Sequence, residues 1–168
     1  MRTGCARDAG EPSPMAIEVA NLLRLYELRG DSHLKTVAER TMKLYGDQVT
    51  SEPTGFGFLL STMEMALHKT ERLVVLEGAN KGLARQLNQQ LWRFYAPHVV
   101  SILAAPQEFV TITQGTGQTG LFGQTAPAKV MSGNSAAYFC SGNTCGIPIA
   151  DPAALKEQLG QLEVQGGL

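Results

Sequence analysis

Apolar residues recur at helical spacing through the first part of the chain. The pattern predicts a first helix through residues 17–28, and Gly30 followed by Asp31 supplies its C-terminal stop and a new N-cap. The same spacing over 34–45 predicts a second helix, and a broad apolar face over about 55–68 predicts a third. The first two helices therefore form a helical hairpin, preceded by a loop that is rich in glycine and proline.

The hydrophobic period changes after residue 71. Residues 73–76 and 99–103 are short, continuous apolar runs, and a helical stripe over 83–94 lies between them. A strand, a helix and a second strand of these lengths predict a βαβ unit with parallel strands and a right-handed crossover. Three aromatic residues near the end of the crossover helix are expected to pack in the core rather than to stack on a sugar: Trp92, Phe94 and Tyr95.

The remaining segments add to the predicted sheet. Residues 109–113 and 136–140 read as further strands, and residues 114–135 read as a flexible loop rich in Gly, Gln, Thr and Ser. A last helix is predicted from Pro152 to about residue 162, with Asp151 as its N-cap.

Composition narrows the classes of protein. The chain of 168 residues is 43% hydrophobic, and its formal net charge is −1, so a nucleic-acid partner is not expected. No apolar run approaches the roughly 20 residues that span a bilayer, and we expect neither a membrane partner nor a signal peptide. The three cysteines fit a reducing compartment better than a disulfide scaffold, so a cytoplasmic location is the expectation.

Two glycine-containing segments have features of phosphate-binding loops. Residues 115–120 match the spacing G-x-G-x-x-G, but no helical period follows them, so a flexible loop is favoured over a nucleotide site. Residues 78–82 lie between a predicted strand and a predicted helix, where free amides favour an anion. Asn80 and Lys81 are therefore candidates for an anion site, although a turn that only caps the helix is the commoner case.

Cys140 and Cys145 are joined by a four-residue segment that suits a tight turn. Three interpretations are open for this pair: a zinc site, a redox dithiol, or two thiols that simply pack at a strand end. Zinc needs further ligands, but the three histidines have no paired spacing. No cationic residue stands beside either thiol in the sequence to stabilise a thiolate, so structural packing is favoured and no metal is expected.

The carboxy-terminal segment carries a resemblance to a known family. Residues 136–148 join an apolar strand to the two cysteines and run on to Asp151 and Pro152. Together with residues 8–13, 21–25 and the Gly30-Asp31 pair, this segment resembles the carboxy-terminal end of the YyaL / spermatogenesis-associated protein 20 family.

The resemblance implies a thioredoxin-like domain fused to an (α/α) barrel of the six-hairpin glycosidase and sugar-epimerase type. It covers about residues 8–159 but only the last part of such a protein, and the chain contains neither a thioredoxin-like segment nor a CxxC pair. In a complete barrel, a loop such as 8–13 lies at the rim of the cavity. Asp8, Glu11 and Ser13 are therefore ligand-cavity candidates, while Ser13 before Pro14 also reads as a helix cap.

These observations lead to an α+β or α/β fold with two parts. Residues 1–70 would supply helical hairpins from the end of an (α/α) barrel, and residues 71–168 would form a small α/β subdomain around a mixed sheet. An apolar helix face along Ile17, Leu34 and Phe56 would be left exposed and would promote self-association.

The function that follows from the resemblance is that of a carboxy-terminal fragment without catalysis or cofactor of its own. No catalytic residue can be named. One alternative is a sugar isomerase or epimerase, with a carbohydrate ligand held in the complete barrel. The other is a redox or protein-interaction module that uses Cys140 and Cys145.

Overall fold

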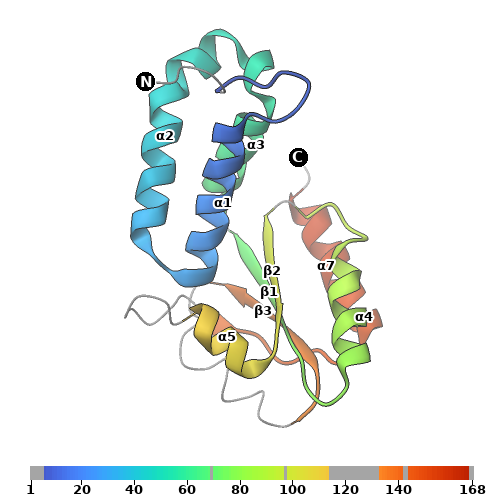
Figure 1. Ribbon diagram of the computed structural model, residues 1–168. Helices are drawn as coiled ribbons and strands as arrows, with labels where there is room; N and C mark the ends of the chain where they lie inside the picture. Colours follow the sequence, from blue (N-terminus) through green and yellow to red (C-terminus); the bar gives the residue numbers. More distant parts are fainter. Residues whose placement is uncertain (1–5, 69, 97, 114–132, 142–143, 167–168) are drawn as a thin grey trace. The chain divides into compact units, whose positions relative to one another are not determined.

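The computed structural model describes residues 6–68, 70–96, 98–113, 133–141 and 144–166, with side chains described up to residue 161 except that of residue 113 (Figure 1). The chain divides into two compact units, Met1–Lys69 and Thr70–Leu168. We call them the N-terminal unit and the C-terminal unit and describe each by itself.

The N-terminal unit is built from helices. The helices α1 (Pro14–Arg29) and α2 (Ser32–Ser51) form the predicted hairpin, and α3 (Gly57–Leu67) follows a short 3-10 helix, Pro53–Phe56. Helix α1 packs against both α2 and α3. Their apolar faces form a core of eight buried residues among those described: Ala16, Val19, Leu23, Ala38, Val49, Phe56, Leu59 and Met65.

The turn between α1 and α2 confirms the predicted stop and start signals. Gly30 ends α1 with a φ of 69°, a left-handed conformation that glycine adopts without a Cβ penalty, and its amide donates to Tyr26 O at 2.8 Å. Asp31 then caps α2, because its carboxylate accepts from the amide of His33 at 2.9 Å. The connection is therefore tight enough to set the two helices antiparallel.

The described residues of the C-terminal unit form a four-stranded mixed sheet in the order β2-β1-β3-β4. Strands β1 (Glu71–Leu76) and β2 (Val99–Ala104) are parallel and are joined by helix α4 (Lys81–Leu91), which confirms the βαβ unit. Strand β3 (Ala136–Ser141) pairs antiparallel with the other side of β1. The fold class is therefore α+β, as the sequence predicts.

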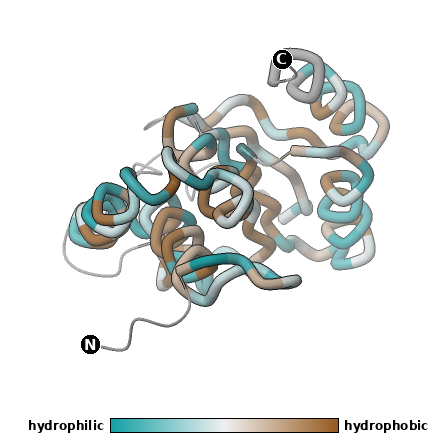
Figure 2. Tube along the Cα trace, turned by 90° about the horizontal axis from the view of Figure 1, so that it is seen from above, coloured by the Kyte–Doolittle hydropathy of each residue, from teal (hydrophilic) through white to brown (hydrophobic). Residues whose placement is uncertain are grey.

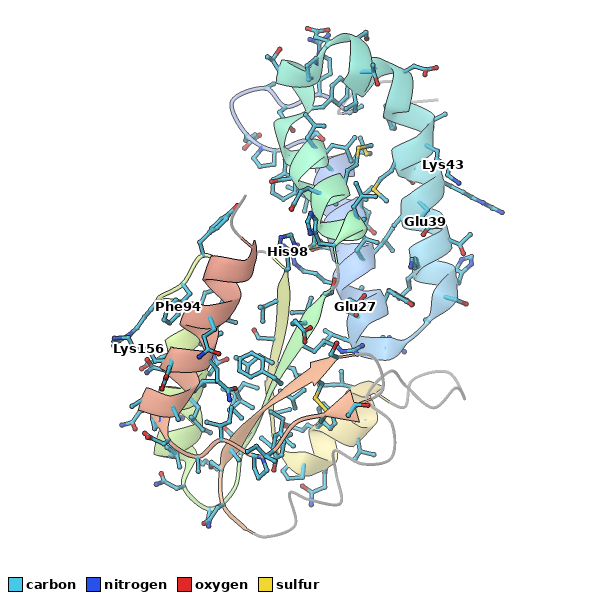
Figure 3. The ribbon with its side chains drawn as sticks, turned by 180° about the vertical axis from the view of Figure 1, so that it is seen from behind. Glu27, Glu39, Lys43, Phe94, His98 and Lys156 are labelled. Atoms are coloured by element: carbon cyan, nitrogen blue, oxygen red, sulfur yellow. A yellow bond between two sulfur atoms is a disulfide. The ribbon has the colours of Figure 1, made fainter. Side chains whose placement is uncertain are left out.

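One face of this sheet carries the main core of the unit. Helices α4 and α7 (Pro152–Gly166) cover it, while α5 (Pro106–Thr113) lies on the other side of the sheet (Figure 1). Phe94 packs beside α7 (Figure 3), where one of its ring carbons lies 3.6 Å from the position that a Cβ of Gly160 would take. The core of this face consists of Leu73, Val75, Ala84, Leu87, Leu91, Ala137, Ile149, Leu155 and Leu159.

The predicted strand at 109–113 is wrong, because these residues belong to helix α5 (Pro106–Thr113). Pro106 suits the first helical turn, and the carboxylate of Glu108 accepts from the amide of Ala105 at 3.0 Å. Phe109 is buried on this helix and its amide donates to Ala105 O at 2.9 Å. The local capping signals therefore outweigh the β-branched composition of the segment.

The outer strand is short and irregular. Strand β4 (Thr144–Cys145) pairs with β3, and Ile149 forms a further antiparallel bridge with Ala137. Three residues separate Cys145 from Ile149 on the outer side, whereas two separate Ala137 from Cys140 on β3. The extra residue is a β-bulge, and it falls in the segment that contains Gly146 and Pro148.

The helices alternate between hydrophobic and hydrophilic residues along the trace, as amphipathic helices do (Figure 2). The expectation that the aromatic residues after α4 pack in the core is correct for Phe94, which is half-buried against that core, but wrong for Trp92 and Tyr95, each of which is 76% exposed. Helix α4 ends at Leu91, so the helical period does not continue through these two residues.

Among the described helices, none is long and apolar enough to cross a membrane.

Two expectations for the long connection before β3 concern residues that are mostly undescribed. The G-x-G-x-x-G match at 115–120 lies outside the described residues, as does the part from 114 to 132 of the flexible loop predicted at 114–135. Residues 133–135 are described, and they are held against the turn between β1 and α4.

Candidate functional site

Asp8, a ligand-cavity candidate, connects two helix starts in the N-terminal unit. The amide of Ser13 donates to Oδ1 of Asp8 at 2.8 Å, and the amide of Phe58 donates to Oδ2 at 2.9 Å. The amide of Asp8 itself donates to Gly55 O at 2.9 Å. Both carboxylate oxygens therefore accept hydrogen bonds from the chain next to the starts of α1 and α3, where the helix dipoles favour a negative charge.

The other two ligand-cavity candidates differ in their surroundings. Ser13 is buried, and its hydroxyl accepts from the amide of Ala16 at 3.2 Å, so that it is the N-cap of α1. Glu11 is exposed. The structure thus gives Asp8 and Ser13 capping roles that the sequence indicated only for Ser13, and a contact of the three residues with a sugar stays a prediction.

The turn between β1 and α4 holds the anion-site candidates. Asn80 caps α4, since its side chain accepts from the amide of Leu83 at 3.0 Å, and Lys81 is exposed at the first helical position. The amide of Ala79 donates to Gly133 O at 2.8 Å. The anion site remains a prediction, and any site here would lack this amide as a donor.

Ser135 completes this turn, and sequence reasoning missed it because it lies in a segment that reads as loop. Its side chain is fully buried, accepts from the amide of Gly78 at 2.9 Å and donates to Asn80 O at 2.6 Å. A Cβ on Gly78 would lie 2.4 Å from the carbonyl carbon of Asn134. The two segments are therefore in direct backbone contact, which a side chain at Gly78 would prevent.

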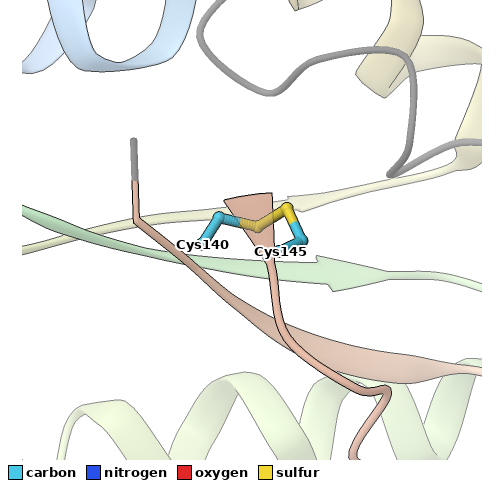
Figure 4. The surroundings of a disulfide bond; sticks show 2 residues. All are labelled: Cys140 and Cys145. Carbon is cyan, nitrogen blue, oxygen red and sulfur yellow. A yellow bond between two sulfur atoms is a disulfide. The ribbon is translucent and has the colours of Figure 1, made fainter. Parts of the chain in front are cut away.

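Cys140 and Cys145 are joined by a disulfide bond (Figure 4). The two residues are register partners on β3 and β4, and their Cα atoms lie 4.0 Å apart. The amide of Gly146 donates to Phe139 O at 2.8 Å, so the next pair along, Cys140 and Cys145, is a non-hydrogen-bonded pair, in which side chains come closest. The structure thus shows the pair as a disulfide rather than as two thiols, because the hairpin register brings the two sulfurs together.

Arg72 lies on β1, which pairs with the edge of β3 that faces away from β4, and it is directly across from Cys140. It is the register partner of Cys140 in the antiparallel pairing of β1 with β3, and it is only 2% exposed. Directly opposed residues of antiparallel strands project to the same face, with Cβ atoms about 4.5–5.5 Å apart. Arg72, Cys140 and Cys145 thus form a row across three strands, on the face opposite to Leu73 and Val75.

This row has a chemistry that the sequence did not indicate. A guanidinium is always charged at physiological pH, and a cation near a cysteine favours its thiolate form. Sequence reasoning found no cationic neighbour of either thiol, because Arg72 is 68 residues from Cys140 and only strand pairing brings them together. In the disulfide state neither sulfur is a thiolate, so neither is a zinc ligand in this structure.

Tyr138 also belongs to this face of the sheet. It is two residues from Cys140 on β3 and is 2% exposed, and burial raises the pKa of its phenol. The phenol therefore stays neutral at physiological pH and places no negative charge beside the sulfurs.

Comparison with known proteins gives one relationship. The chain is 21% identical over 155 residues to the human protein spermatogenesis-associated protein 20. The matched region covers 91% of this chain but 19% of that protein. No protein-family model matches the chain, and no solved structure matches it. The chain is thus distantly similar to a small part of spermatogenesis-associated protein 20.

Proposed function

We propose that this chain is the carboxy-terminal region of a longer protein of the YyaL / spermatogenesis-associated protein 20 type, and that it has no catalytic activity of its own. The observation that carries the proposal is the extent of the similarity, which runs through 91% of this chain but only 19% of the human protein. The sequence features of the resemblance run through this chain from residues 8–13 to Pro152.

The N-terminal unit supports the first half of this proposal. Helices α1 and α2 form an antiparallel hairpin with α3 packed on α1, and helical hairpins are the repeating element of an (α/α) barrel. In the proposed protein, residues 1–70 supply the last hairpins of the barrel. The C-terminal unit is then a small α/β subdomain that follows the barrel.

The two carboxylates of the loop 8–13 support the proposal that the chain alone has no catalytic activity. Paired carboxylates act as acid and base only when both reach the substrate. Both oxygens of Asp8 accept hydrogen bonds from backbone amides, whereas the side chain of Glu11 is exposed. In the complete protein, a carbohydrate ligand would therefore meet Glu11 rather than Asp8 in this loop.

The experiment compares the chain with a longer protein expressed from its own gene. Genomic sequence upstream of the Met1 codon is expected to encode further helical hairpins in frame, and the longer protein is then purified beside the chain. A panel of monosaccharides and disaccharides should raise the melting temperature of the longer protein but not that of the chain. A sugar-dependent rise or sugar isomerisation with the chain alone would contradict the proposal, as would an upstream region with no in-frame coding sequence.

A further inference from the structure

The two sulfurs of the Cys140–Cys145 disulfide lie in different surroundings. Cys140 is fully buried on β3, which is paired on both sides, whereas Cys145 is partly exposed on β4. Among the described strands, β4 is at the edge of the sheet. An attacking thiolate therefore reaches the Sγ of Cys145 before that of Cys140.

We propose that this disulfide is a redox-active site that exchanges with a dithiol reductant, and that Arg72 stabilises the thiolate that Cys140 becomes when the bond opens. The inference is independent of the proposed function, since it concerns only the C-terminal unit. Arg72 does not itself react, and its positive charge acts only on the stability of the thiolate. The two cysteines are the reacting groups.

The exchange proceeds in two steps. A thiolate of the reductant attacks Sγ of Cys145, a mixed disulfide forms, and the bond to Cys140 breaks with its electron pair left on Sγ of Cys140 as a thiolate. The second thiol of the reductant loses its proton to solvent and attacks the reductant's first sulfur. Cys145 leaves as a thiolate and takes up a proton, so the chain ends with a thiol at Cys145 and a thiolate at Cys140, and the reductant becomes a disulfide.

Arg72 favours the first step because it lowers the free energy of the leaving thiolate. A leaving thiol with a lower pKa departs faster. The register places the Arg72 and Cys140 side chains on the same face of the sheet, and the burial of Arg72 limits the screening of its charge by water. Tyr138, the neutral neighbour on the same strand, does not oppose this effect.

The sheet is built to remain folded when the bond opens. Strand β3 pairs with β1 through five registered residues, whereas β4 contributes only two. The disulfide closes a short loop with a sequence separation of five, and short loops gain the least chain-entropy stabilisation from a cross-link. Reduction should therefore free the outer strand and leave the β1–β3 core in place.

The first test uses the protein with only Cys5 replaced by Ser, so that two cysteines remain. It is incubated with a monothiol, the reaction is quenched with acid, and the mixed disulfide is located by peptide mass spectrometry. The expected result is attachment at Cys145 while circular dichroism stays unchanged. Attachment at Cys140, or no attachment before the protein unfolds, would overturn the proposal.

The second test measures the contribution of Arg72 with dithiothreitol as the dithiol. Arg72→Met should slow reduction at least about threefold, whereas Arg72→Lys, which keeps the charge, should stay close to the parent. Arg85→Met is the matched control, because it removes the same charge from an exposed position on α4. Equal rates for Arg72→Met and Arg85→Met would overturn the role of Arg72.

A third measurement serves if Arg72→Met does not fold. With Cys5 and Cys145 replaced by Ser, the thiolate absorbance of Cys140 is followed against pH. The pKa of Cys140 should fall below the ordinary thiol value of about 8.5. A pKa at or above that value would overturn the proposal, since burial without a cationic neighbour raises the pKa of a thiol.

Discussion

The amide of Gly78 donates a hydrogen bond to the hydroxyl of Ser135, 57 residues further along the chain. The same hydroxyl donates to Asn80 O, so one side chain satisfies a donor and an acceptor of the β1–α4 turn. Ser135→Ala should therefore lower the free energy of unfolding by about 1–3 kcal/mol, because it removes the partner of two backbone groups in part-buried hydrogen bonds. Urea denaturation measures the change, and Ser61→Ala, an exposed site on α3, is the control and should stay within about 0.5 kcal/mol of the parent.

Gly78→Ala should be destabilising for a steric reason. The new Cβ would lie 2.4 Å from the carbonyl carbon of Asn134, which is a backbone atom and cannot move aside as the end of a flexible side chain could. We expect a loss of about 1–3 kcal/mol, as in other overpacked sites, and a lower melting temperature. Gly46→Ala provides the contrast, because a Cβ there meets nothing within 4 Å in the interior of α2 and should stabilise the helix. Equal melting temperatures for the two variants would contradict the close approach at Gly78.

Asp8→Ala tests the double capping role of this carboxylate. Loss of the acceptors for Ser13 and Phe58 should lower the free energy of unfolding by about 1–3 kcal/mol, more than a single cap contributes on average. Glu11→Ala, three residues away and exposed, should have almost no effect on stability. If both variants unfold like the parent, Asp8 does not hold the helix starts together.

Val75→Asp tests the buried face of the sheet. Val75 is fully buried in the core beneath α4 and α7, so an unpaired carboxylate there should cost roughly 3–5 kcal/mol or prevent folding. Ser101→Ala, on the neighbouring strand β2, should be mild. Urea denaturation measures the free energy of unfolding of each variant. If Val75→Asp unfolds at the same urea concentration as the parent, that result would contradict the burial of β1.

Tyr138 makes stability depend on pH in the alkaline range. Burial raises the pKa of the folded phenol above its unfolded value of about 10, so the folded chain keeps a proton that the unfolded chain loses. Its contribution to stability is complete below pH 10 and is lost as the pH rises through the folded pKa. Tyr138→Phe should lose this dependence above pH 10, and a tyrosine absorbance titration should lack its last step. If the step that the variant lacks lies near pH 10, at the ordinary value for tyrosine, the phenol of Tyr138 is solvated.

The elements with a clear hydrophobic period were predictable from the sequence, and their contacts across the sheet were not. Residues 73–76 and 99–103 predicted two parallel strands, of which β1 is buried and β2 is largely half-buried, and Gly30 with Asp31 marked a helix end and start. Helix α5 was misread because Ile112 and Val110 favour a strand, although Pro106 and Glu108 carried the capping signal.

The candidate site depends on the pairing of strands that are far apart in the sequence. Nothing in the sequence fixes that β3 adds to β1 in antiparallel register, and this register alone places Arg72 opposite Cys140. The disulfide depends on the hydrogen-bond pattern between β3 and β4. Hydrogen-bonded and non-hydrogen-bonded pairs alternate along the two strands, and the two cysteines form a non-hydrogen-bonded pair. Ser135 was hidden for the same reason, since its partners at Gly78 and Asn80 lie more than 50 residues away.

The bulge beside β4 has a consequence for encounters between copies of this chain. A strand from another molecule can extend a sheet only where a straight row of amide and carbonyl groups is offered. The outer segment after Cys145 offers no such row, because the extra residue shifts the alternation and Pro148 has no amide hydrogen to donate. This side of the sheet is therefore a poor template for edge-to-edge growth, and the chain gains protection from amyloid-like stacking at a position where its sheet would otherwise be open.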